Sequence, residues 1–300
     1  MSNFFSPSKV RVVPNCKLAK VTHNLSEQNY QKLLDGKSRK IVEKKHHKKF
    51  GEILSEYTIS NVDGFDNSDP LSFFDYSVLS VCISESLAGN NILTLPIILR
   101  GLTGKSKGSN GGSANGAVNS DQRNAIIFSL EKLMSTIVKY NCSDANKKLG
   151  YNDSTNTIIT DTILPCHFAT SKINGQIVED TIFLDRQSPI FTIADQRNQI
   201  IRYDVDLLDV PYQNNTPLVI SLKNYILLRI CEIKLHKMTP TITWDDVFKK
   251  ARIFDKDNKT KLRARDYALQ FFKHLQDKGF IKSFEIIKKR NQFYGVKFTF

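Results

Sequence analysis

Basic side chains gather at two places near the end of the chain, and their chemistry suits a polyanion. One group begins a long amphipathic stretch, and the other occupies a polar turn between two apolar runs: Lys261, Arg263 and Arg265, then Lys288, Lys289 and Arg290. Guanidinium groups donate paired hydrogen bonds to guanine and phosphate, whereas an ammonium contacts phosphate as a point charge. We therefore expect Arg263 and Arg265 to contact base edges of double-stranded DNA, and the other four to contact phosphates.

The elements that position these groups are predicted to be a short helix, a longer helix and a hairpin. Apolar residues at three- and four-residue spacing predict helices over 244–251 and 261–278. Gly279 follows, where a left-handed helix end is expected, and alternation on both sides of 288–292 predicts the hairpin. This order is that of a winged helix. In that fold the second helix of the helix-turn-helix motif enters the major groove of DNA. The segment 244–300 holds 15 Lys and Arg against 7 Asp and Glu, in a chain of formal net charge +13.

The same order of elements is predicted a second time, earlier in the chain. Helix, short strand, helix and helix are expected over 71–87, 92–94, 95–102 and 121–134, matching 218–235, 241–243, 244–251 and 261–278. Strands over 135–141 and 156–168 follow, and a hairpin pivots on Asn174-Gly175. The first copy has its own candidate DNA-contacting residues at the position that corresponds to those of the second copy: Gln122, Arg123 and Asn124.

The predicted fold class is therefore α+β, with two tandem winged-helix domains and an extra N-terminal basic segment. The expected divisions are an N-terminal extension over 1–60, a first winged helix over 65–205, a linker over 206–217 and a second winged helix over 218–300. A further helix is expected over 188–203. Residues 37–49 hold seven Lys and Arg against one acid and predict a solvated helix face or an arm on the DNA backbone, using Lys44, Lys45, Lys48 and Lys49.

Composition favours an intracellular, cytoplasmic protein with a polyanionic partner. The 300 residues suggest about two domains, and the pI is about 9.4. No run approaches the roughly 18 apolar residues of a membrane span, and no secretory signal is evident at the N-terminus. Five cysteines are scattered without a paired framework, which fits a reducing compartment.

No catalytic site, metal site or cofactor is predicted, and the chain is not expected to be an enzyme. Gly101 to Ser106 imitates a P-loop, but Leu99 stands where that motif needs its first glycine. His46 and His47 are adjacent and would point to opposite faces of a strand. No base or oxyanion element can be placed beside Cys166-His167, so these residues are expected to be structural.

The order of elements resembles the replication initiator (Rep) proteins of plasmids and related mobile elements. The stretches that carry the resemblance are 74–79, 92–94, 207–211 and 218–234 within a tandem winged-helix layout over about residues 70–300. The resemblance implies binding to repeated origin sequences, a homodimer that switches to a monomer, recruitment of host replication proteins, and no chemistry of its own. The basic segment before residue 50 and the Gly/Ser/Asn-rich loop over 105–119 depart from the family's compact pattern.

Three other functions stay open at the level of sequence. A transcriptional regulator would use one winged helix on a palindromic operator and the other domain for dimerisation. A protein-interaction module would use its winged helices on other proteins and would bind DNA only weakly. A metal-dependent nuclease is the remaining alternative.

Overall fold

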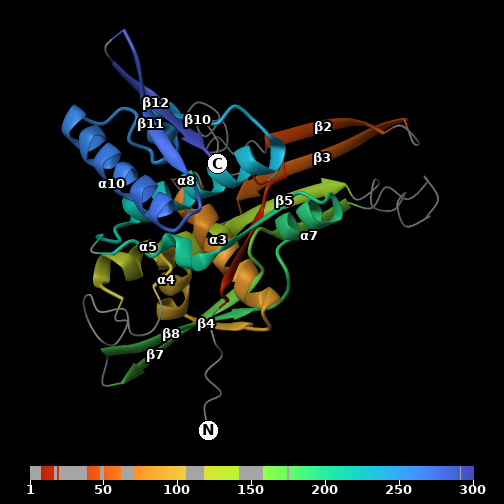
Figure 1. Ribbon diagram of the computed structural model, residues 1–300. Helices are drawn as coiled ribbons and strands as arrows, with labels where there is room; N and C mark the ends of the chain where they lie inside the picture. Colours follow the sequence, from red (N-terminus) through yellow and green to blue (C-terminus); the bar gives the residue numbers. More distant parts are fainter. Residues whose placement is uncertain are drawn as a thin grey trace.

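The computed structural model describes residues 8–16, 19, 39–47, 51–61, 71–105, 118–141, 158–173, 176–211, 213–290 and 292–300. Lys48, Lys49, the Asn174-Gly175 turn and most of the Gly/Ser/Asn-rich loop lie outside these ranges. No helix among the described residues is both long enough and apolar enough to cross a membrane. The described elements form mixed helical and sheet structure around one continuous core (Figure 1).

Residues 71–204 contain a first unit, in which a helix, a short strand and two more helices are followed by a hairpin. In chain order these are α3 (Phe73–Leu87), β4 (Ile92–Thr94), α4 (Leu95–Thr103), α5 (Ser120–Ser135), β7 (Cys166–Ile173) and β8 (Gln176–Leu184). The short strand β4 pairs antiparallel with the return strand β8, which gives the sheet order β4-β8-β7.

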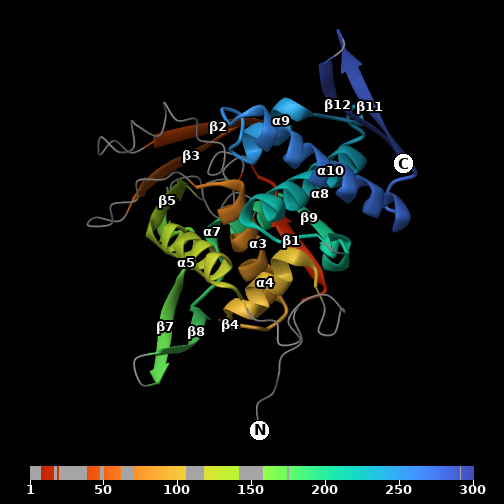
Figure 2. The same ribbon diagram turned by 90° about the vertical axis from the view of Figure 1, so that its left-hand side faces the viewer.

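Residues 217–300 form a second unit with the same topology. Its elements are α8 (Pro217–His236), β10 (Thr241–Thr243), α9 (Trp244–Lys250), α10 (Asn258–Asp277), β11 (Ser283–Lys289) and β12 (Gln292–Thr299). Here too the short strand pairs with the return strand, in the order β10-β12-β11. The repeated element order predicted from the sequence is confirmed. The two hairpins project from opposite ends of the molecule in both views (Figures 1 and 2).

Local sequence explains where the helices begin and end. The side chains of Ser72, Thr243 and Asp257 each accept a hydrogen bond from the first turn of α3, α9 and α10, respectively. Gly279 has φ +68, so the left-handed helix end predicted there is confirmed. The helix α10 begins three residues earlier than predicted, because Asp257 caps a polar segment that carries no apolar periodicity.

Several strands outside the repeated topology were not predicted. A strand β1 (Val10–Pro14) pairs with β9 (Ile200–Asp204), so residues assigned to an N-terminal extension line the core of the first unit. Only α7 (Pro189–Gln196) of the helix expected over 188–203 is helical. That prediction was wrong in its second half, where Ile201 and Tyr203 alternate into the core as part of β9.

The described part of the basic run before residue 50 is a strand and not a helix. Its residues 39–47 are strand β2, which pairs with β3 (Gly51–Asn61), and the sheet continues through β5 (Thr136–Asn141) and β6 (Ile158–Thr162). The stretch expected as one strand over 156–168 is divided at residues 163–165, where the chain passes from β6 to β7. The β2–β3 hairpin extends away from the body (Figure 1).

The helices α3 and α8 are buried around nearly their whole circumference and hold the two units together. Phe73 of α3 meets Tyr225 of α8 edge to face, with ring centroids 5.4 Å apart. Asn224 of α8 donates to the carbonyl of Leu102 at 3.1 Å, which joins α8 to α4. Arg11, only 1 % exposed, donates to the carbonyls of Ser77 and Gly101, so β1 is tied to α3 and α4.

Residues 205–211 and 213–216, which we call the connector, pass from the first unit to the second. Its first residues form a short 3-10 helix, Val205–Leu208. Gly104 ends α4 with φ +78, and a Cβ placed there would lie 2.5 Å from the carbonyl oxygen of Val205. Only glycine permits this approach. The segment predicted as an irregular linker is therefore packed closely against the first unit.

A buried ion pair links α3 to α5. The Nζ of Lys132 lies 2.6 Å from Oδ2 of Asp75, and the two side chains are 5 % and 2 % exposed. Removing one partner of a buried pair leaves an uncompensated charge. We predict that Lys132→Met lowers the free energy of unfolding by about 3–5 kcal/mol in a urea titration.

A matched control is Arg186→Met, which breaks an ion pair with Asp161 in which the arginine is 63 % exposed. Its expected cost is under about 1 kcal/mol, because solvent screens exposed pairs. Equal costs for the two variants would contradict the assignment of Lys132 to a buried, stabilising contact.

The buried amine of Lys223 predicts a pH dependence of stability. Its pKa is lowered from the usual 10.5 to about 7: burial is the largest cause, the charge of Asp209 opposes the shift, and the charge of Lys105 adds a smaller lowering. The unfolded chain therefore binds a proton that the folded chain releases above about pH 7, and the free energy of unfolding rises with pH. Between about pH 7 and 8.5, before thiols and tyrosines ionise, wild type should gain up to about 1.4 kcal/mol per pH unit relative to Lys223→Met. Parallel profiles in urea titrations would show that this amine does not titrate in the window.

Candidate nucleic-acid interface

The predicted DNA-contacting residues of the second unit fall into two groups in the structure. Lys261 and Arg265 are one helical turn apart and share one flank of α10. Arg263 is exposed but lies about 200° around the helix from Arg265, because successive residues turn by about 100°. Arg290 is exposed in the turn of the β11–β12 hairpin, with φ +49. The structure thus separates Arg263 from the surface that Arg265 shares with the hairpin.

Arg265 faces the hairpin and rests on an aromatic ring. Its guanidinium carbon lies 4.8 Å from the centroid of Phe293, and Nζ of Lys288 lies 5.3 Å from the same centroid. Beside them, Nζ of Lys289 lies 3.7 Å from the ring centroid of Tyr294. These are cation–π distances. The two rings are 47 % and 38 % exposed, so each presents a face or edge to solvent together with its cations.

A third exposed ring extends this surface to the turn between α9 and α10. Phe254 is 41 % exposed, and Nζ of Lys249 and of Lys261 lie 5.2 and 5.5 Å from its centroid. The Nε of Arg265 is buried and meets no acceptor among the described residues. We call the whole set the basic–aromatic surface: Lys249, Phe254, Lys261, Arg265, Lys288, Lys289, Phe293 and Tyr294.

The chemistry of this surface suits a nucleic-acid backbone. Its cations neutralise phosphates, and its exposed rings pack on the apolar faces of sugars or bases. Sequence reasoning found the charges and missed the rings. Phe293 and Tyr294 had been assigned to the alternating pattern of a hairpin, although neighbouring aromatics cannot both point into one core. That adjacency, next to a basic turn, was the available signal.

The corresponding place in the first unit is arranged differently. Arg123 of α5 makes a two-point ion pair with Asp180 of β8, Nε to Oδ2 at 2.6 Å and the second nitrogen to Oδ1 at 2.9 Å. Gln122 completes the N-terminal cap of α5 and donates to the carbonyl of Asn215 at 2.9 Å. Asn124 is exposed. A DNA contact by Arg123 therefore requires the loss of its ion pair.

Charge separates the two units as well. The elements α5, β7 and β8 carry three Lys and Arg against four Asp and Glu, whereas α10, β11 and β12 carry eight against three. In each unit an arginine of the third helix meets the return strand of the hairpin, but only in the second is its partner uncharged. A polyanion is therefore attracted to the second unit.

The predicted contacts near the N-terminus lie on the edge of another sheet. Lys44 and Lys45 belong to β2, opposite Leu54 and Ile53 of β3. Lys48 and Lys49 lie outside the described residues. The strand β2 is at the edge of the order β2-β3-β5-β6.

Burial makes the thiol of Cys166 a poor nucleophile, while His167 beside it is exposed. Burial, followed by the nearby charge of Asp185, raises the pKa of the Cys166 thiol to about 12. His167 stacks on Phe183, and its Nδ1 lies 2.8 Å from Asp185. A nucleophilic cysteine needs a lowered pKa, so this pair has the wrong electrostatics for thiolate chemistry at neutral pH. Among the described residues, no three His, Cys, Asp or Glu side chains gather as they would around a metal ion.

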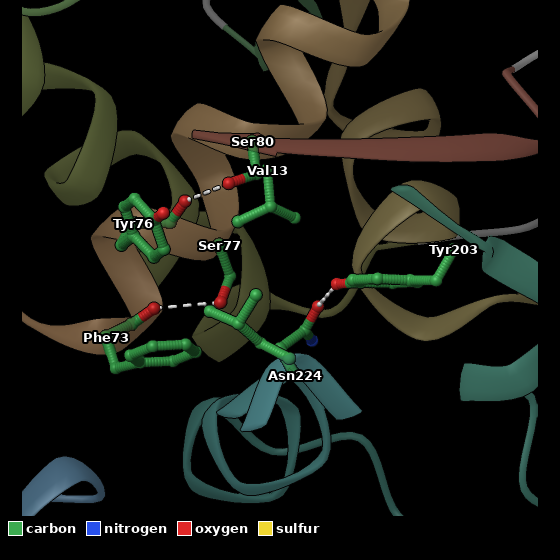
Figure 3. Close-up of a pocket in the computed structure, with 8 residues that line it drawn as sticks. Val13, Phe73, Tyr76, Ser77, Ser80, Tyr203 and Asn224 are labelled. Carbon is green, nitrogen blue, oxygen red and sulfur yellow. Dashed lines mark hydrogen bonds between the residues drawn. The ribbon is translucent and has the colours of Figure 1, made fainter. Parts of the chain in front are cut away.

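One cavity in the core is lined partly by polar groups but is very small. It lies where α3, β1, β9 and α8 meet, beside Ser77, Tyr203 and Asn224 (Figure 3). The hydroxyl of Tyr203 donates to Oδ1 of Asn224 at 3.5 Å. A volume of about 10 Å³ accommodates no more than about one water molecule. The cavity is thus a packing detail of the core and has no room for a substrate.

Comparisons with known proteins give few matches. No family model matches the chain, and no curated protein matches it. A crystal structure of domains 2 and 3 of RctB, a selenomethionine derivative, has 11 % sequence identity and a TM-score of 0.39, covering 87 % of this chain and 90 % of that one. A second crystal structure of RctB domains 2-3 has 10 % identity and a TM-score of 0.38, covering 88 % and 92 %. Likeness at this level decides neither fold nor function.

The basic–aromatic surface predicts how polyanion affinity depends on salt. We expect Lys288→Ala to weaken binding to a mixed-sequence DNA duplex and to reduce the slope of log affinity against log salt by about 1, the value for one lost phosphate contact. Titrations of a fluorescent duplex at several salt concentrations measure the slope. Arg202→Ala, which removes an exposed charge from β9, is the control and should leave the slope unchanged. The same loss in both variants would mean that only net charge matters.

Proposed function

We propose that this protein binds double-stranded DNA sequence-specifically through two tandem winged helices. The observation that carries the proposal is the basic–aromatic surface on the third helix and hairpin of the second unit. Support comes from the topology of both units: three helices, a short strand paired with the return strand, and a projecting hairpin. In a winged helix these parts are the helix-turn-helix and the wing.

In this proposal α10 lies in the major groove and the β11–β12 hairpin follows the backbone beside it. Arg265 and Arg263 contact base edges from two sides of α10, and Lys261 contacts a phosphate. Lys288, Lys289 and Arg290 contact phosphates at the wing, where Phe293 and Tyr294 pack on sugars. In the first unit, exposed Asn124 gives a weaker contact, which Arg123 joins only by leaving Asp180 and Gln122 only by leaving the carbonyl of Asn215.

The biological role that we propose is that of a replication initiator of a plasmid or mobile element, which binds repeated origin sequences. Two winged helices joined in one chain suit a long asymmetric site repeated in the same orientation. The resemblance of the element order to Rep proteins adds the expectation of a homodimer and of host replication proteins as partners. No catalysis, cofactor or metal belongs to this proposal, and we place the protein in the cytoplasm.

A transcriptional regulator is the second candidate, and one observation favours it. Only the second unit carries a basic surface, while the third helix and hairpin of the first are close to neutral. A chain with one DNA-binding unit and one unit for self-association would form a symmetric dimer on an inverted repeat.

Selection from a random duplex library at about 150 mM salt tests the proposal, since non-specific binding is weak at that salt. We expect enrichment of a long asymmetric sequence that is bound cooperatively when placed in direct repeats. Arg265→Ala should relax the base preference at one position and weaken binding by about 1–3 kcal/mol. A lone inverted repeat would instead assign the protein to the regulators. No enrichment at all would remove DNA recognition from the proposal.

A further inference from the structure

The connector touches the third helix of both units. Asn215 accepts the Nε2 hydrogen bond of Gln122, in the first turn of α5, through its backbone carbonyl. Two residues earlier, Gln213 is 5 % exposed and donates to the carbonyl of Tyr267 at 3.2 Å and to Oε1 of Gln270 at 3.4 Å, both on α10. Three residues of the connector thus span the distance between the two helices that the proposed function places on DNA.

The connector is itself held from behind by α8. Lys223, 2 % exposed, donates to the carbonyl of Leu208 at 2.8 Å and to Oδ1 of Asn215 at 3.0 Å. Asn215 therefore accepts one hydrogen bond on its backbone and one on its side chain, from helices of different units. Pro211 also restricts φ at one position of this path, and Pro217 begins α8 directly after it.

We propose that the connector is a strut that fixes the separation and rotation of α5 relative to α10, and that Gln122, Gln213 and Asn215 set the half-site spacing the protein accepts on duplex DNA. The inference rests on the proposed function for its DNA part. These three are positioning residues, because they act through the placement of two helices.

The reason such a strut matters is the helical geometry of DNA. One inserted base pair moves a half-site by about 3.4 Å along the axis and turns it by roughly 35°. A connector held by several buried or part-buried hydrogen bonds and by close glycine packing cannot follow that turn without losing them. A connector without those hydrogen bonds can follow the turn. The range of half-site spacings that the protein tolerates therefore measures how rigid the connector is.

The first test needs no DNA. Spin-labelled non-natural residues replace Asn124 on α5 and Lys273 on α10, both exposed, and the distance distribution between them is measured by dipolar spectroscopy. We expect one narrow distribution in the wild-type background and a clearly broader one in the double variant Gln213→Ala, Asn215→Ala. The matched control Asn214→Ala changes the exposed neighbour and should keep the narrow distribution. Distance distributions of equal width in all three backgrounds would refute the proposal that the connector acts as a strut.

The second test uses the selected DNA site with base pairs inserted or deleted between its halves. Wild type and Asn214→Ala should lose about tenfold in affinity per base pair of error, a penalty of about 1.4 kcal/mol. The double variant should lose less than about threefold, while its affinity for the isolated α10 half-site stays unchanged. Identical spacing preference in wild type and double variant would refute the inference. If the wild-type protein selects no DNA sequence, the proposed function is refuted instead. The distances between the spin labels would then decide by themselves whether the connector is rigid.

Discussion

The arrangement depends on one constraint, the burial of α8. This helix is buried around nearly its whole circumference, and its apolar residues on several sides are stable only when those sides are covered. It is the first helix of the second unit, yet α3, α4 and β9 of the first unit cover part of it. Separating the units would expose that apolar surface to water. This cost opposes an arrangement in which the two units move independently.

Within that fixed body the two units share a topology but differ in surface chemistry. An aspartate on the first hairpin neutralises the arginine of α5, and an aromatic ring on the second hairpin leaves the arginine of α10 charged. Together with the surplus of Lys and Arg on α10, β11 and β12, this exchange of partner changes the surface without a change of fold. It explains how one architecture presents a charged face at one end and a neutral face at the other.

Much of the second unit could be predicted from sequence, because its helices and hairpin are local patterns bounded by polar turns. Asp180 could not be assigned to Arg123, since the pair is 57 residues apart and an ion pair leaves no periodic signal. Likewise β2 has few apolar residues, and its charge run resembles a solvated segment until β3 is known to pair with it. Phe293 and Tyr294 were visible in the sequence, but their exposure depends on where the sheet meets α10.

The pairing of β1 with β9 has a consequence for the order of folding. Val10 lies opposite Asp204, so the first unit cannot close its sheet until nearly two hundred further residues have been made. At typical translation rates of 5–20 residues per second, β1 waits roughly 10–40 s for its partner strand. During that interval its apolar side chains are exposed on the nascent chain. The strand β1 is thus synthesised long before its partner strand and is among the last parts of the first unit to reach its native place.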